Sequence, residues 1–238
     1  MILLDIEGTT TPIAFVTGTL VPYARARLHA HLERHAGSPH GRALLEAIRR
    51  EHAADTGAHG AVPAWHETGP ETLAPAEAYL AWLMDHDRKS PVLKELQGYI
   101  WEDGYRRGEL VAPVYPDVAP AFARWRHDGR ALGIFSSGSV LAQQWLFRRS
   151  SAGDLTPHLQ WYFDTNTGPK REPASYAAIA AVVSLPPAEI LFISDVAAEL
   201  DAARAAGMRT VLSQRPDNPP QPPHTHRVIT SFDEVSSA

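Results

Sequence analysis

Two carboxylates near the start of the chain, Asp5 and Glu7, are the first residues whose types and spacing could do chemistry. They follow an apolar run over residues 2–4, which predicts a buried strand, and Gly8 follows them, where the backbone can turn sharply. Two carboxylates at one strand end repel unless a cation or a shared proton offsets their charge. A hard divalent cation such as Mg²⁺ prefers oxygen ligands. The stretch fits a metal site, although two solvated acids in a turn fit it equally well.

Hydroxyl groups and a lysine occur at two further positions where the chain enters a predicted helix. An apolar strand over 131–135 runs into Ser136-Ser137-Gly138-Ser139 and then a helix. Hydroxyls and backbone N–H groups there could bind an anion, or a serine of the run could simply cap the helix. Lys170 lies just before another helix, where its compact charge could hold a phosphate oxygen. A solvated loop lysine is the ordinary alternative.

A third strand, residues 190–193, runs into Asp195, with Glu199 four residues further on. Asp195 could join the first two acids at one sheet edge or cap the next helix. Glu199 is expected to support the site indirectly or to lie on the helix face, rather than to bind a metal. Taken in order, these groups supply a nucleophile, a metal site, a hydroxyl cradle and a fixed cation. That set fits phosphoryl transfer through an aspartyl-phosphate.

The elements that must position these residues alternate between strands and helices, which predicts an α/β fold with a doubly wound, mostly parallel sheet. This core is expected to comprise residues 1–14 and 112–238, with strands over 2–4, 131–135, 162–163, 190–193, 210–212 and 227–229. Residues 15–111 are expected to form an all-helical insertion after the first strand. Within it, helices are predicted from 20 to 32, from 39 through 48, from 75 to 84 and from 91 to 105, and a loop over 55–73.

Composition narrows the function classes. The 238 residues carry a formal net charge of -5, which gives no general attraction for nucleic acid or an anionic membrane. The chain has no cysteine, which excludes disulfides, thiolate metal sites and a cysteine nucleophile. A core strand is predicted from Ile2, and no apolar run approaches the length of a membrane span, so we expect a cytoplasmic protein. The sequence itself gives no oligomeric state, and it contains no heptad repeat or exposed apolar stripe that would indicate a coiled-coil partner.

Two other features have ordinary explanations. His31 and His35 have a spacing compatible with a metal site, but no acidic partner follows a zincin-like pattern, so they are interpreted as solvated residues on a helix face. The proline-rich residues 214–224 could bind a partner as a polyproline segment, but a stiff surface loop between the last two strands is the simpler interpretation.

The chain resembles the haloacid dehalogenase-like phosphohydrolases over nearly its whole length and, within them, is similar to the enolase-phosphatases of methionine salvage. The most specific similarity is Glu7, because most of the superfamily has aspartate there. The resemblance rests on Leu-Leu-Asp-Ile-Glu-Gly-Thr-Thr-Thr-Pro-Ile at 3–13, Gln-Gly-Tyr-Ile-Trp-Glu-Asp-Gly-Tyr at 97–105, Ser-Ser-Gly-Ser-Val at 136–140, Tyr-Phe-Asp-Thr at 162–165, Gly-Pro-Lys-Arg-Glu at 168–172, Ile-Ser-Asp at 193–195 and Glu-Leu-Asp-Ala-Ala at 199–203.

This resemblance implies a Mg²⁺-dependent catalytic site. Asp5 would be the nucleophile and a metal ligand. Glu7, through its side chain or its backbone carbonyl, and Asp195 would complete the protein ligands. The phosphate would be held by Ser136, Ser137 and Lys170. The helical insertion would be a cap that closes over the substrate and sets specificity. The protein would be a monomer. The substrate would be a small phosphorylated diketone, 2,3-diketo-5-methylthiopentyl-1-phosphate, converted through its enol phosphate to an acireductone.

The residues leave some alternatives open. A general small-metabolite phosphatase without enolase activity would share the core motifs, and Glu7 and residues 97–105 argue against it. A dehalogenase fits less well, because Lys170 and the acids suit phosphate and metal. A binding protein with an inactive site, or an interaction protein acting through its proline-rich loop, fits least. The base that removes the substrate proton stays open among the acids at positions 102, 103 and 109.

Overall fold

The computed structural model describes residues 1–57, 60–66, 73–86, 88 and 90–235. It divides into two compact units, a core unit of Met1–Thr17 and Tyr105–Ala238 and a helical unit of Gly18–Gly104. The predicted boundaries, after residues 14 and 111, differ from these unit boundaries, after residues 17 and 104, by three and seven residues. Helical structure runs without a break across each boundary, so no change in the sequence pattern marks either position.

The core unit contains one parallel sheet with the strand order β3-β2-β1-β4-β5-β6. The central strand β1 is buried throughout, and Leu4 pairs with Ile134 on one side and Ile193 on the other. The chain builds outward from β1 to β3 and then returns to β4. The change of direction places a ligand crevice at the carboxyl ends of β1 and β4. The strands are β1 Ile2–Leu4, β2 Leu132–Phe135, β3 Trp161–Phe163, β4 Leu191–Ser194, β5 Arg209–Ser213 and β6 Arg227–Ile229.

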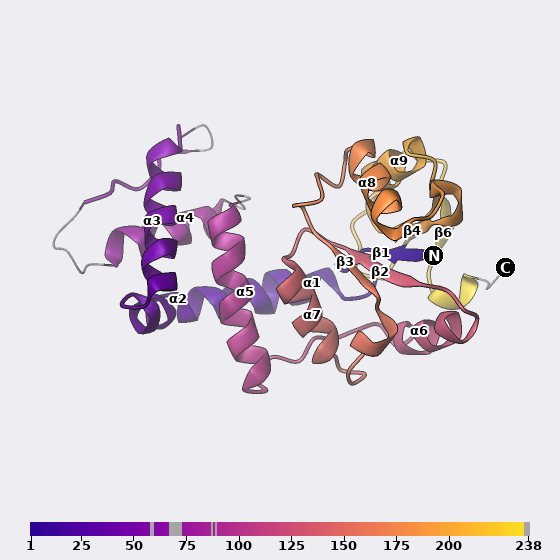
Figure 1. Ribbon diagram of the computed structural model, residues 1–238, viewed down its shortest axis with the longest axis horizontal. Helices are drawn as coiled ribbons and strands as arrows, with labels where there is room; N and C mark the ends of the chain where they lie inside the picture. The colour runs from indigo at the N-terminus through magenta and orange to yellow at the C-terminus, as the bar shows by residue number, and fades with distance from the viewer. Residues whose placement is uncertain (58–59, 67–72, 87, 89, 236–238) are drawn as a thin grey trace. The chain divides into compact units, whose positions relative to one another are not determined.

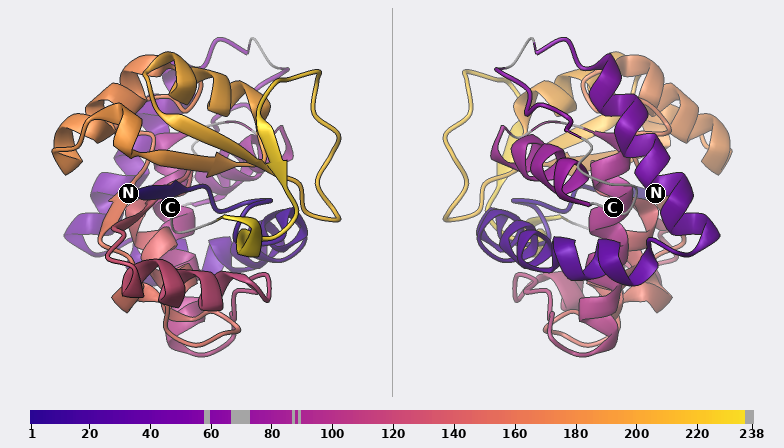
Figure 2. Two further views of the ribbon diagram at one scale, coloured as in Figure 1. Left: turned by 90° about the vertical axis from the view of Figure 1, so that its right-hand side faces the viewer. Right: turned by 90° about the vertical axis from the view of Figure 1, so that its left-hand side faces the viewer.

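Helices cover both faces of this sheet, with α8 and α9 on one face and α6 and α7 on the other (Figure 1). Figure 2 shows the sheet between these two layers. The predicted doubly wound α/β fold is confirmed. The helices of the core unit are α1 Ile13–Phe15, α6 Val118–His127, α7 Val140–Arg148, α8 Pro173–Val183 and α9 Ala197–Ala205, with 3₁₀ turns η2 Thr156–His158, η3 Pro187–Glu189 and η4 Phe232–Glu234.

The proline-rich loop after β5 is more than a surface connection. Arg215, near its start, is buried between the rings of Tyr115 and Phe232. Its guanidinium donates two hydrogen bonds to the carbonyl oxygen of Thr9, at 3.1 and 3.0 Å, and pairs with Asp117 at 2.8 Å. The loop is therefore tied to the turn that follows β1, which the composition of the loop alone could not predict.

The helical unit is built from amphipathic helices that pack on one another. The segment opens with a π-helical turn, η1, and the indole N–H of Trp101 donates to the carbonyl oxygen of Leu20 at 2.8 Å, which ties α5 to the start of α2. The predicted loop over 55–73 forms no helix or strand in its described part, and residues 58–59 and 67–72 lie outside the described residues. The elements are η1 Val16–Leu20, α2 Val21–His35, α3 Pro39–Ala54, α4 Ala74–Asp85 and α5 Pro91–Arg106, the first and last of which extend into the core unit.

His31 on α2 is buried in the helical unit, so the interpretation of His31 as a solvated residue is wrong. It occupies the same helix face as Leu28 and Leu32, and its ring lies 4.5 Å from that of His35. Burial, with the repulsive charge of His35, lowers the pKa of His31 to about 4, against the weaker attraction of Asp103. A cationic His31 is therefore unfavourable in the folded unit.

Stability should consequently fall as the pH falls from about 6.5 to about 4. In that interval the unfolded chain binds a proton at His31 that the folded chain excludes. The resulting decrease in the free energy of unfolding is at most about 3 kcal/mol. The test is the free energy of unfolding in urea at pH 7 and pH 4.5, for the wild type and for His31→Gln. The variant should lose less stability on acidification. Equal losses of stability in the two proteins would show that His31 is not the group responsible.

Candidate active site

The site begins at the carboxyl end of β1, where Asp5 is 5% exposed and its backbone N–H donates to the carbonyl oxygen of Ile193 on β4 at 2.9 Å. A tight turn follows. The N–H groups of residues 9–11 all donate to the carbonyl oxygen of Ile6, at 2.9 to 3.2 Å. Gly8 in this turn has φ +65°, a left-handed conformation that a residue with a Cβ rarely adopts. The predicted sharp turn at Gly8 is confirmed.

A buried network links this turn to Lys170. The Nζ of Lys170 lies 2.8 Å from Asp5 Oδ2 and 2.6 Å from Glu199 Oε2. The hydroxyl of Ser194, at the end of β4, lies 3.2 Å from the same Asp5 oxygen and 3.1 Å from the same Glu199 oxygen. Burial alone would lower the pKa of Lys170, but the charges of Asp5 and Glu199 outweigh it and raise that pKa. Lys170 is therefore a fixed cation beside Asp5.

The first turn of α8 holds the Lys170 loop in place. The hydroxyl of Tyr176 donates to the carbonyl oxygen of Lys170, and the hydroxyl of Ser175 donates to that of Pro169, both at 2.7 Å. Tyr176 is fully buried, and its ring lies 5.5 Å from that of Phe135 and 5.1 Å from that of Phe192. The aromatic core between β2, β4 and α8 thus fixes the position of the lysine.

The two serines follow β2 at the same edge of the sheet. Ser136 is buried, and its backbone N–H donates to the carbonyl oxygen of Phe163 at 3.2 Å, whereas Ser137 is exposed. The cap of α7 is Ser139, whose hydroxyl accepts from the N–H of Ala142. The alternative that a serine of this run caps the helix is therefore confirmed for Ser139, while Ser136 and Ser137 precede the cap position. Both remain beside the Asp5 strand end.

Asp195 follows β4 and is 5% exposed. The residue at the cap position of α9 is Val196, so capping does not occupy the Asp195 carboxylate. Burial and the charge of Asp5 raise the pKa of Asp195 to about 7. Burial and the same charge raise the pKa of Glu199 to about 7, against the opposing effect of Lys170. The repulsion among these carboxyl groups, which Lys170 offsets only in part, disfavours the ionised forms of Asp195 and Glu199 unless another cation is present.

Comparison with known proteins places the chain in a family. The model for haloacid dehalogenase-like hydrolases matches residues 1–207. Enolase-phosphatase E1 of Synechococcus elongatus is 52% identical over 98% of this chain and 96% of that protein. The Sorangium cellulosum enzyme of the same name is 47% identical over 99% of this chain and 96% of that protein. The crystal structure of the UTR4 protein of Saccharomyces cerevisiae has a TM-score of 0.78 at 34% identity and covers 98% of both chains. The chain belongs to the enolase-phosphatase family.

Membership in this family of haloacid dehalogenase-like hydrolases makes the protein a phosphoric monoester hydrolase. Enzymes of the family generally depend on a metal ion. In the described part of the chain no three His, Cys, Asp or Glu side chains converge as a metal cluster. A metal held by Asp5 and Asp195 would need a further oxygen from the backbone, such as the carbonyl of Glu7, or from water. Oxygen donors with unbalanced negative charge fit a hard divalent cation.

Sequence reasoning underrated two members of the network. Glu199 was expected to act indirectly or to face outward, but it contacts Lys170 directly. Ser194 was not singled out at all, although it sits between two carboxylates. The available signal was the spacing, since residues 195 and 199 lie one helical turn apart at a strand end.

Replacing Gly8 by alanine should weaken both metal binding and phosphatase activity. A Cβ at this position would lie 2.4 Å from Asp195 Oδ2, and φ +65° would be strained for alanine, so the turn and Asp195 must shift. A ten- to hundredfold loss, of about 1.4–2.8 kcal/mol, is expected in kcat/KM, with weaker binding of a divalent cation by calorimetry. The control is Gly129→Ala, where the glycine also has a positive φ but no atom lies within 4 Å of its Cβ position. Unchanged activity in Gly8→Ala would contradict the tight contact.

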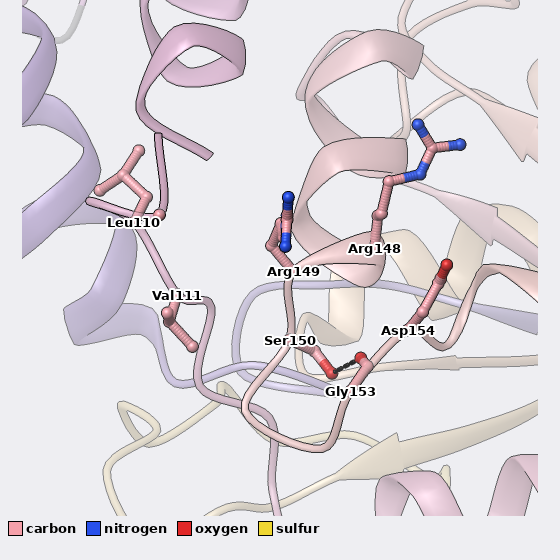
Figure 3. A pocket seen from close by; sticks show the side chains of 8 residues that line it. Leu110, Val111, Arg148, Arg149, Ser150, Gly153 and Asp154 are labelled. Carbon is pink, nitrogen blue, oxygen red and sulfur yellow. Dashed lines mark hydrogen bonds between the residues drawn. The ribbon is translucent and has the colours of Figure 1, made fainter. Parts of the chain in front are cut away.

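A hollow elsewhere in the core unit contains none of these residues. It has a volume of about 510 Å³ and is lined by residues of the segments 108–111 and 148–154 (Figure 3). The second segment follows the carboxyl end of α7 and forms a tight turn there, in which the hydroxyl of Ser150 donates to the carbonyl oxygen of Gly153 at 2.6 Å.

The residues described include no helix with the length and apolar character of a membrane span.

Proposed function

We propose that this protein converts 2,3-diketo-5-methylthiopentyl-1-phosphate through its enol phosphate to the acireductone 1,2-dihydroxy-3-keto-5-methylthiopentene and phosphate, in methionine salvage. Support comes from 52% identity to an enolase-phosphatase over nearly the whole chain. The observation that carries the proposal is the 2.8 Å contact between Lys170 Nζ and Asp5 Oδ2 at the crevice beyond β1 and β4. It sets a carboxylate nucleophile beside a cation that can hold a phosphate oxygen.

In the phosphatase half, a carboxylate oxygen of Asp5 attacks phosphorus, and the bond from phosphorus to the enol oxygen breaks. The bonding electrons leave with that oxygen, which takes a proton. Water then hydrolyses the aspartyl-phosphate, which releases phosphate and restores Asp5. Lys170 and the hydroxyl and N–H groups at Ser136 and Ser137 bind the phosphoryl oxygens while their charge redistributes. Lys170 is fixed by Glu199 and Tyr176, so little reorganisation is needed during transfer.

Mg²⁺, held by Asp5, Asp195 and Glu7, would supply Lewis-acid stabilisation of phosphoryl and enolate oxygens when bound. An enol oxygen is a better leaving group than an alkoxide. This difference relaxes the demand for a strong general acid at position 7, where the longer glutamate replaces aspartate. Glu7 lies in the turn after β1 and is half-exposed, with its backbone paired to that of Thr11. The helical unit is proposed to supply substrate specificity, and the protein is proposed to be a cytoplasmic monomer.

The test follows enol absorbance and phosphate release in one sample of the diketo phosphate, with Mg²⁺, with a chelator, and with Mg²⁺ restored. Enol absorbance that precedes phosphate, with both lost in chelator and both recovered with Mg²⁺, is the expected result. Phosphate release without enol formation, also at stopped-flow resolution, would favour a general small-metabolite phosphatase. Neither signal from folded protein with Mg²⁺ would overturn the proposal.

A further inference from the structure

Asn218 lies in the loop between β5 and β6. The nitrogen of its side-chain amide is hydrogen-bonded, whereas the oxygen of the same amide accepts no hydrogen bond from the described residues. Its Nδ2 donates to the carbonyl oxygen of Gly8 at 2.8 Å and to that of Ser213 at 3.1 Å. Because both neighbours are acceptors, the amide orientation follows: the NH₂ group must face them. The oxygen, Oδ1, then points elsewhere.

That oxygen is buried and has no hydrogen-bond partner among the described residues. A buried amide oxygen normally has a partner, so one left without a protein donor calls for an explanation such as a bound water or ion. The position of Asn218 Oδ1 indicates what its partner would be. A Cβ atom at Gly8 would lie 3.0 Å from Asn218 Oδ1 and 2.4 Å from Asp195 Oδ2, so both oxygens face the same small space beside the turn.

We infer that Asn218 is a positioning residue of the metal site, with Oδ1 accepting a hydrogen bond from a metal-bound water. Mg²⁺ usually keeps several of its waters, and each needs an acceptor. Outer oxygen acceptors of this kind commonly change metal affinity by ten- to hundredfold. The same side chain holds the carbonyl of Gly8, so one residue anchors the turn after Asp5 and orients the water. The inference rests on the metal site of the proposed function.

The test measures the Mg²⁺ dissociation constant of the full chain by calorimetry, and the melting temperature with and without Mg²⁺, for Asn218→Ala and Asn218→Asp. Alanine removes both the donor and the acceptor. Aspartate keeps an oxygen but loses the NH₂ group that faces the carbonyls of Gly8 and Ser213. Asp217→Asn, a change at the exposed neighbouring position of the same loop, is the matched control.

We expect Asn218→Ala to weaken Mg²⁺ binding by about ten- to hundredfold. Asn218→Asp should bind Mg²⁺ at least as tightly as the wild type, although it melts at a lower temperature without metal. The Mg²⁺ dissociation constant of Asp217→Asn should stay within about twofold of the wild-type value, since a charge in water is strongly screened. Equal weakening in both Asn218 variants would show that only the Gly8 anchor matters, and an unchanged alanine variant would show that neither does; either result overturns the inference. A wild type that binds no divalent cation would overturn the proposed metal site as well.

Discussion

Replacement of Asp5 by asparagine is expected to abolish phosphate release while the protein stays folded. Asparagine has almost the same shape, but its amide oxygen is a poor nucleophile and cannot form a phosphoryl ester that water then cleaves. Loss of a covalent nucleophile typically costs far more than loss of a binding contact, so a decrease in kcat of at least about 10⁴-fold is expected. Lys170 keeps its partner Glu199 in this variant, which should preserve its position.

Phosphate release from a preformed enol phosphate is the decisive measurement, because it bypasses the enolisation step. Asp154→Asn, which changes an exposed carboxylate in the core unit, controls for the charge change. Rapid quenching of wild-type enzyme with labelled substrate should also trap a phosphorylated protein that the Asp5→Asn variant does not form. Retention of more than a few per cent of wild-type turnover by the variant would exclude Asp5 as the nucleophile.

The overall fold could be predicted because its signals are local. Each strand of the sheet contains a short apolar stretch, and such stretches are expected in parallel strands that helices cover on both faces. The place of the candidate site followed from the same reasoning: parallel strands end together, so the residues after β1, β2 and β4 had to lie near one another. Position in the topology thus specified Asp5, Ser136 and Asp195 as neighbours without any knowledge of side-chain contacts.

The parts that the sequence did not predict depend on contacts between distant segments. Arg215 and Asn218 reach the turn after β1 from a proline-rich loop about two hundred residues away, and a loop composition carries no information about such contacts. The burial of His31 could have been inferred, because it shares a helix face with Leu28 and Leu32. The spacing between His31 and His35 is also compatible with metal binding, so only the helix periodicity of the neighbouring leucines distinguishes a buried His31 from a surface one.

Removal of the charge of Lys170, by Lys170→Met, is expected to reduce both activity and stability. The substituted side chain keeps most of the volume but leaves the Asp5 and Glu199 carboxylates buried without their cation. Removing one partner of a buried ion pair typically costs about 3–5 kcal/mol, because the remaining charge is unpaired. Loss of the fixed cation beside the phosphate should also lower kcat/KM by at least about 10²-fold, as for other donors that stabilise transition-state charge.

These two effects can be separated with a second substitution, Glu199→Gln. In the double variant Lys170→Met with Glu199→Gln, one unpaired charge is gone, and the amide oxygen of the substituted side chain can still accept from the Ser194 hydroxyl. The free energy of unfolding in urea should therefore recover by about 1–3 kcal/mol relative to Lys170→Met, as expected for directly coupled sites. Activity should not recover, since no cation returns to the phosphate site.

Comparison of the two single variants with the double variant also separates the role of Glu199 from that of Lys170. Glu199→Gln alone should loosen the lysine without removing its charge, so its loss in kcat/KM should be much smaller than that of Lys170→Met. If stability and activity instead recovered together in the double variant, Lys170 would act only by balancing buried charge. If neither single variant changed activity, the phosphate would have to be held by the Ser136 and Ser137 segment alone, and the contact between Lys170 and Asp5 would be structural.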